Sequence, residues 1–134
     1  MQQPTTVSYA ALQQYRSTSN YGGTVEASPH KLVEMLYTGA IDRLATARGA
    51  VLRGEVAVKL RTLGSALAIV EHLRLSLDHE AGGAIARNLD ALYDYLGRRL
   101  LQANVRDDVE AIDEALALLR QIKSAWDGIA PTRQ

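Results

Sequence analysis

The sequence predicts an all-α protein: an antiparallel up-down four-helix bundle with a mobile N-terminal arm that can form a short capping helix. Composition is the first observation behind this prediction, because 20 of the 134 residues are Ala, 19 are Leu and only 3 are Pro. Ala and Leu are the apolar residues that most favour helices. Spacing is the second observation, since apolar residues recur with a helical period in four stretches separated by short breaks. Short connections make consecutive helices antiparallel neighbours.

The N-terminal segment differs in composition from the rest of the chain. Arg16 is the only charged residue between positions 1 and 25, where Gln, Ser, Thr and Tyr are frequent. Such a segment contributes little to a core. We therefore predict an arm or cap at 1–27 and a four-helix bundle at 28–131. Three side chains at intervals of three residues give the arm one helical face that can dock on an apolar surface: Tyr9, Leu12 and Tyr15.

Capping residues mark the first two helices. Ser28 is a favoured N-cap and Pro29 is favoured at the first helical position, so a helix is predicted over 29–53. Gly54 ends it, because glycine commonly terminates helices. The second helix is predicted over about 55–77.

The connection at 78–83 contains Gly-Gly and is predicted to be a solvated turn that caps helix ends. The third helix is predicted over about 84–103. The fourth is predicted to open at Asp107, with Glu110 three residues later in a capping-box arrangement, and to end near Trp126.

The width of the apolar face differs between the helices. In the third helix the apolar side chains fall within about 100°, as in an ordinary core stripe. These residues are Ile85, Leu89, Leu92, Tyr93, Leu96, Leu100 and Ala103. In the second and fourth helices the apolar residues cover about 180°, more than a core-facing helix needs. Either the core is thick with Ala-rich flanks, or the surplus forms a groove for a partner helix.

Composition and motifs exclude several classes of function. Lys and Arg together number 15, as do Asp and Glu, so the basic excess typical of nucleic-acid binding is absent. The chain has no cysteine, no apolar run long enough to cross a membrane and no signal peptide, so we predict a cytoplasmic protein. No Glu-x-x-His pair or serine-nucleophile motif is present. We therefore expect no metal, no cofactor and no enzymatic activity.

One alternative function concerns His72. Histidine phosphotransfer domains are also four-helix bundles with one exposed histidine, and helical angles place His72 on the polar side of the second helix. The small residue that follows is Ser76 rather than the glycine of the phosphotransfer pattern. A signalling bundle that uses His72 is thus the alternative to a binding protein.

Four ordered segments resemble the FliS family, the flagellar secretion chaperones of flagellin. They are ASPHKLVEMLYTGA at 27–40, LDHEAGG at 77–83, ARNLDALYDYL at 86–96 and RRLLQAN at 98–104, followed by AW at 125–126. The resemblance spans about residues 9–131. Thr38 departs from the acidic residue that usually precedes the glycine, which is a minor change at the surface.

The resemblance implies a function in flagellar type III secretion. Members bind the C-terminal segment of newly made flagellin in the cytoplasm, prevent premature polymerisation and deliver flagellin to the export apparatus. The segment forms helices as it wraps along apolar grooves, and it displaces the N-terminal arm. Tyr15 matches the arm tyrosine of the family, whereas Tyr9 and Leu12 match less closely.

Candidate groove residues flank or leave the core stripes. Leu60, Leu67, Leu118 and Ile122 lie beside the stripes of the second and fourth helices, and Tyr95 and Leu101 lie off the stripe of the third. Two aromatic residues are expected to belong to the core instead: Tyr93, and Trp126 as a plug at the end of the fourth helix.

Overall fold

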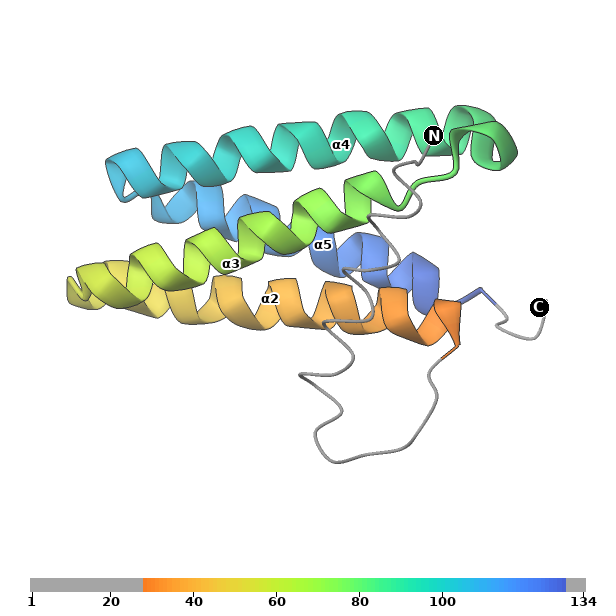
Figure 1. The fold of residues 1–134 in the computed structure, drawn as a ribbon. Coiled ribbons are helices and arrows are strands. Elements are labelled where there is room, and N and C mark those ends of the chain that lie inside the picture. The colour runs from red at the N-terminus through yellow and green to blue at the C-terminus, as the bar shows by residue number, and fades with distance from the viewer. Residues whose placement is uncertain (1–27, 130–134) are drawn as a thin grey trace.

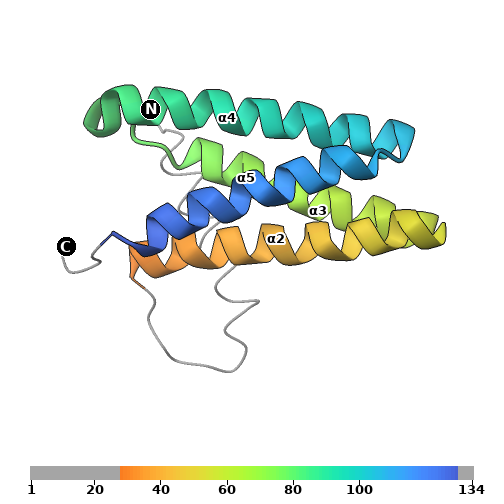
Figure 2. The same ribbon diagram turned by 180° about the vertical axis from the view of Figure 1, so that it is seen from behind.

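The structure of the chain is a computed structural model, and it describes residues 28–129. These residues form four α-helices: α2 (Pro29–Arg53), α3 (Val56–Leu75), α4 (His79–Arg106) and α5 (Val109–Asp127). Consecutive helices run in opposite directions, as Figures 1 and 2 show from two sides. Because α2 packs on α3 and α5 while α4 also packs on both, α2 and α4 lie at opposite corners. The predicted all-α bundle is confirmed. The predicted arm at 1–27 lies outside the described residues.

The ends of α2 form as the sequence predicts. The Ser28 hydroxyl accepts a hydrogen bond of 3.1 Å from the Lys31 amide. Gly54 has φ 71°, and its amide donates to the carbonyls of Ala50 and Val51. A left-handed residue at this place favours glycine, which has no Cβ to clash with the backbone. Both signals are local, which explains why the sequence alone contains them.

The start of α4 differs from the prediction. The helix begins at His79 rather than at residue 84, because the Asp78 carboxylate accepts from the amides of Glu80 at 3.1 Å and Ala81 at 3.0 Å. Gly83 then interrupts the helix with φ 51° and ψ −123°, which kinks it. The segment predicted as a turn is thus a capped helical turn followed by a glycine kink.

The junction between α4 and α5 lies later in the chain than predicted: α4 ends at Arg106 rather than near residue 103, and the N-cap of α5 is one residue later. Asp107 does not cap α5 but is the C-cap of α4. It adopts a left-handed conformation with φ 52°, which Asp tolerates better than most residues. Asp108 is the N-cap, and its carboxylate accepts from the Ala111 amide at 3.1 Å. With two consecutive aspartates, the helix geometry decides which of them caps.

The core runs along the whole bundle and is almost entirely aliphatic. Its largest fully buried side chains are Leu36, Leu44, Val70, Leu73, Leu96, Leu100, Ile112 and Leu119. The predicted stripe of α4 is confirmed at Tyr93, Leu96, Leu100 and Ala103. It is wrong at Ile85, which is 70% exposed. Ile85 follows the kink at Gly83, where the apolar face of α4 continues without another described helix to cover it.

Lys59 is a buried cation that the apolar pattern did not predict. It is only 9% exposed, and its Nζ donates to the Asn104 carbonyl at 3.0 Å and to the Asp107 carboxylate at 2.7 Å. A cation at the C-terminal end of a helix is stabilised by the unpaired carbonyls there. Lys59 therefore fastens the start of α3 to the end of α4. None of the four helices is long and apolar enough to cross a membrane, as far as residues 28–129 extend.

Candidate functional site

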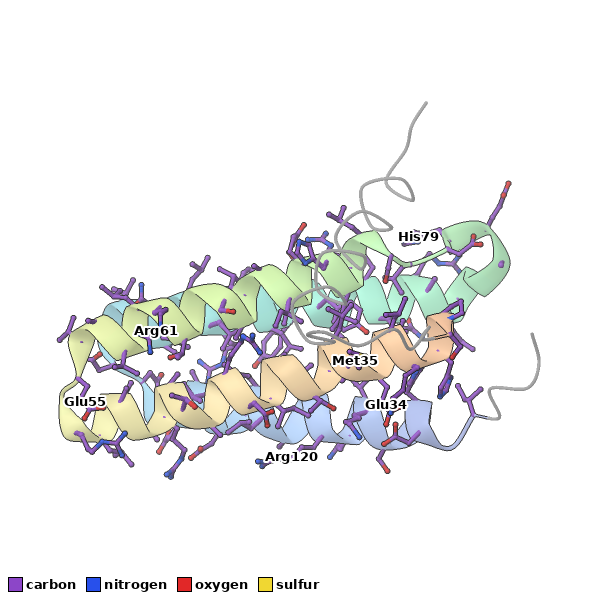
Figure 3. The ribbon with its side chains drawn as sticks, turned by 60° about the horizontal axis from the view of Figure 1, so that its bottom comes forward. Glu34, Met35, Glu55, Arg61, His79 and Arg120 are labelled. Carbon is purple, nitrogen blue, oxygen red and sulfur yellow. The ribbon has the colours of Figure 1, made fainter. Side chains whose placement is uncertain are left out.

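An apolar groove lies at the end of the bundle where α2 begins and α5 ends. Figure 3 shows this end near His79, opposite Glu55 in the turn between α2 and α3. The groove consists of two adjoining cavities of about 350 Å³ and about 390 Å³, which share four lining residues. These four are Tyr37, Ile85, Leu89 and Trp126. We call the two cavities together the end groove.

All four helices contribute to the walls of the end groove. Val33 comes from α2, Leu73 from α3 and Ile122 from α5, and the first turns of α4 add the exposed Ile85. Ile129, just after α5, is 50% exposed and lines the second cavity. Exposed apolar side chains that gather around one hollow are typical of a surface that binds another protein.

Trp126 fixes one wall of the end groove. Its Nε1 donates to the His30 carbonyl at 3.0 Å, and its ring stacks on the His30 ring with centroids 4.7 Å apart and an interplanar angle of 12°. The Tyr37 ring meets it edge to face at 6.4 Å. Trp126 was predicted to be a core plug. It does pack against the core, but it also lines both cavities, and these contacts hold the end of α5 against the start of α2.

Two buried tyrosines lie at the base of the end groove. The hydroxyl oxygens of Tyr37 and Tyr93 are 2.6 Å apart, and each residue is only 2% exposed. Burial raises the pKa of both hydroxyls, because the charged phenolate would lose its solvation. Both groups therefore remain protonated hydrogen-bond donors. The prediction that Tyr93 belongs to the core is confirmed.

A polar cluster joins α4 to α5 away from the end groove. The Glu114 carboxylate accepts from the Tyr95 hydroxyl and from Arg99 Nε, each at 2.7 Å. These two hydrogen bonds lower the pKa of Glu114, since both favour the charged carboxylate. The cluster thus holds α4 and α5 together, and the Tyr95 hydroxyl already has its hydrogen-bond acceptor within it.

Comparison with known proteins identifies the family of this bundle. The sequence model of the family described as "Flagellar protein FliS" matches residues 9–133. The chain belongs to the FliS family. It is 43% identical to the flagellar secretion chaperone FliSB of Pseudomonas aeruginosa over 120 residues, which cover 90% of this chain and 95% of that protein. It is 45% identical over 121 residues to flagellar secretion chaperone FliS of Vibrio cholerae, covering 90% and 89% of the two chains. The corresponding protein of Salmonella typhimurium is 44% identical over 123 residues, which cover 91% of each chain.

Membership of the FliS family confirms the predicted resemblance and bears on the alternative at His72. All of these relatives are named as flagellar secretion chaperones, and none of them supports a phosphotransfer function. His72 lies partly buried on α3. The structure offers no separate reason to retain it as a reactive group.

The predicted contact residues of this FliS protein do not form one site. Ile122 lines the end groove. Leu67 and Leu118 are partly buried and pack against the core, whereas Leu60 and Leu101 are 51% and 54% exposed, respectively. Tyr9, Leu12 and Tyr15 lie outside the described residues.

Leu60, Leu67 and Leu101 come from the face shared by α3 and α4. These helices approach closely, since a Cβ added at Gly97 would lie 3.6 Å from Leu67 Cδ1. Lys59 sets the pairing of their ends. Leu60 lies seven residues before Leu67 on α3 and Leu101 lies four residues after Gly97 on α4, so each shares the helix side of one member of this contact. We call this side of the bundle the α3–α4 face.

Several end-groove residues were absent from the predicted contacts. Tyr37, Ile85 and Leu89 carry the same apolar pattern as core residues, so periodicity alone could not separate them. The sequence does hold one signal for Ile85, which is its position shortly after Gly82-Gly83. There the apolar stripe of the third predicted helix extends beyond the expected end of the second.

Proposed function

We propose that this chain is a cytoplasmic export chaperone that binds the C-terminal segment of flagellin. Binding prevents premature polymerisation and delivers flagellin to the flagellar export apparatus. The observation that carries the proposal is the FliS family match over residues 9–133. The end groove supports it, because a helical client segment needs an open apolar surface on which to bury its own apolar face.

A client that folds as it binds must offset the cost of its own ordering by burying apolar area in the end groove. Buried apolar area contributes about 25 cal/mol per Å². Ordering a disordered segment opposes binding by about 2–5 kcal/mol or more. Asp78 is the one charged residue among the described residues of the groove walls. Selectivity would therefore come from shape and apolar register more than from charge.

We also propose that residues 1–27 compete with flagellin for the end groove. The segment joins the bundle at Ser28, immediately before α2, whose residues Val33 and Tyr37 line the groove. A segment attached at this point has a high effective concentration at the groove. Tyr9, Leu12 and Tyr15 are the side chains proposed to occupy it.

A peptide titration tests the proposed function. We expect a synthetic peptide of the C-terminal segment of the flagellin encoded in the same genome to bind with a Kd below about 10 µM, or more than about 7 kcal/mol of binding free energy. Trp126 is the single tryptophan of the chain and lines both cavities, so its fluorescence should change on binding. A peptide of the same composition in shuffled order is the control. Absence of binding at about 10 µM would contradict the chaperone function.

Removal of residues 1–20 tests the role of the arm. We expect several-fold tighter binding of the flagellin peptide, because the groove no longer has to release a competitor. The helical circular dichroism should stay unchanged. Replacing Tyr9, Leu12 and Tyr15 together by Ser in the full chain should act in the same direction. Loss of helicity would instead mean that the arm belongs to the core. Unchanged affinity for the flagellin peptide would contradict competition between the arm and flagellin for the end groove.

A further inference from the structure

The hydrogen bond between the two tyrosines at the base of the end groove uses only one of their two O–H groups. Tyr37 and Tyr93 contribute two O–H groups, and their oxygens are 2.6 Å apart. Only one of the two hydrogens can lie between these oxygens. Among residues 28–129, neither hydroxyl makes a further hydrogen bond, so the second O–H has no described partner. Both tyrosines line the cavity of about 350 Å³.

We propose that this second O–H is donated to a neutral carbonyl oxygen of the flagellin segment that occupies the end groove. The inference rests on the proposed function and adds a polar point of recognition to an apolar surface. A buried donor without a partner is unfavourable, because it has lost its hydrogen bonds to water. A client that brings an acceptor to this point removes the penalty, whereas a purely apolar client does not. Tyr37 and Tyr93 thereby determine specificity.

The surroundings favour a neutral acceptor over a carboxylate. The described walls of the groove carry no Lys or Arg, and their single charged residue is the acidic Asp78. A client carboxylate would lose its solvation without gaining a cationic partner. Most backbone carbonyls inside a bound helix are already hydrogen-bonded. The acceptor is therefore the side-chain amide of Asn or Gln, or a carbonyl at the end of a helical turn.

The hydroxyls can be removed with little change in shape. Tyr37→Phe with Tyr93→Phe deletes both oxygens at once, and replacing both partners of a buried hydrogen bond by apolar groups is nearly neutral for stability. Circular dichroism and urea denaturation of the free double variant should therefore match the original chain. Thr62→Val is the matched control. It removes a buried hydroxyl that donates to the Val58 carbonyl in its own helix and lies outside both cavities.

Affinity for the flagellin peptide is the decisive measurement. We expect the double variant to bind about tenfold more weakly, as for the loss of one buried hydrogen bond. The Thr62→Val variant should bind within about twofold of the original chain, a difference too small for the loss of such a bond. If the double variant also binds within that range, the hydroxyls do not recognise the client and the inference is overturned. The original chain would still bind in that case, so the chaperone function itself would stand.

The chemistry of the acceptor is tested with the peptide. Each Asp and Glu of the peptide is replaced in turn by Ala, which removes the side-chain acceptor, and affinity is measured for the original chain and for the double variant. The ratio of the two affinities should stay constant throughout, as expected for a neutral acceptor. A ratio that falls toward one at a single acidic position would identify a carboxylate acceptor and overturn the inference.

Discussion

Replacing Ile85 by Asp is expected to weaken binding of the flagellin peptide about a hundredfold, or about 2.7 kcal/mol, while the bundle stays folded. Ile85 lines both cavities of the end groove, and it is 70% exposed in the free chain. The substitution therefore removes little core. Under a bound segment, however, it loses apolar burial and leaves a carboxylate without a cationic partner.

Val56→Asp is the matched control for this variant. Val56 is 60% exposed and begins α3 at the opposite end of the bundle. An acidic side chain in the first turn of a helix is favourable, so stability should not fall. Titration followed by Trp126 fluorescence should give an unchanged Kd for Val56→Asp. Equal weakening by both variants would mean that the effect is not specific to the end groove, since Val56 lies one turn before Leu60 on α3. No weakening by Ile85→Asp would contradict binding of the client in the end groove.

Replacing Leu96 by Ala is expected to lower the free energy of unfolding by about 3 kcal/mol, within the range of about 2–5 kcal/mol for such core truncations. Leu96 is fully buried in α4 and belongs to the continuous core of the bundle. The loss combines the missing burial with the void left among rigid neighbours. Urea denaturation monitored by circular dichroism should show a lower midpoint with an unchanged slope.

Leu101→Ala, in the same helix, separates core from surface. Leu101 is 54% exposed, so its truncation should change the free energy of unfolding by less than about 0.5 kcal/mol. The same variant tests the predicted client contact on the α3–α4 face, where affinity for flagellin should fall without a loss of stability. A large loss of stability from Leu101→Ala, or none from Leu96→Ala, would contradict the assignment of core and surface.

The sequence was sufficient for the features that depend on neighbours along the chain. The helix over 29–53 with its caps at Ser28 and Gly54 is found as predicted, because a cap is a contact across three or four residues. The central stripe of α4 is also found as predicted. The family resemblance followed in the same way from ordered local motifs. The roles of Tyr9, Leu12 and Tyr15 stay predictions.

Tertiary structure alone decided which apolar and polar side chains are covered. Ile85 and Leu96 belong to the same predicted stripe of α4, yet one is 70% exposed and the other is buried. Lys59 is buried because the end of α4 offers it a carbonyl and a carboxylate from 45 and 48 residues away in the sequence. Periodicity fixes the face of a helix on which a residue lies, but exposure depends on how far the neighbouring helices extend along that face. The end groove exists because the apolar face of α4 continues, after its kink, beyond the cover that the other described helices provide.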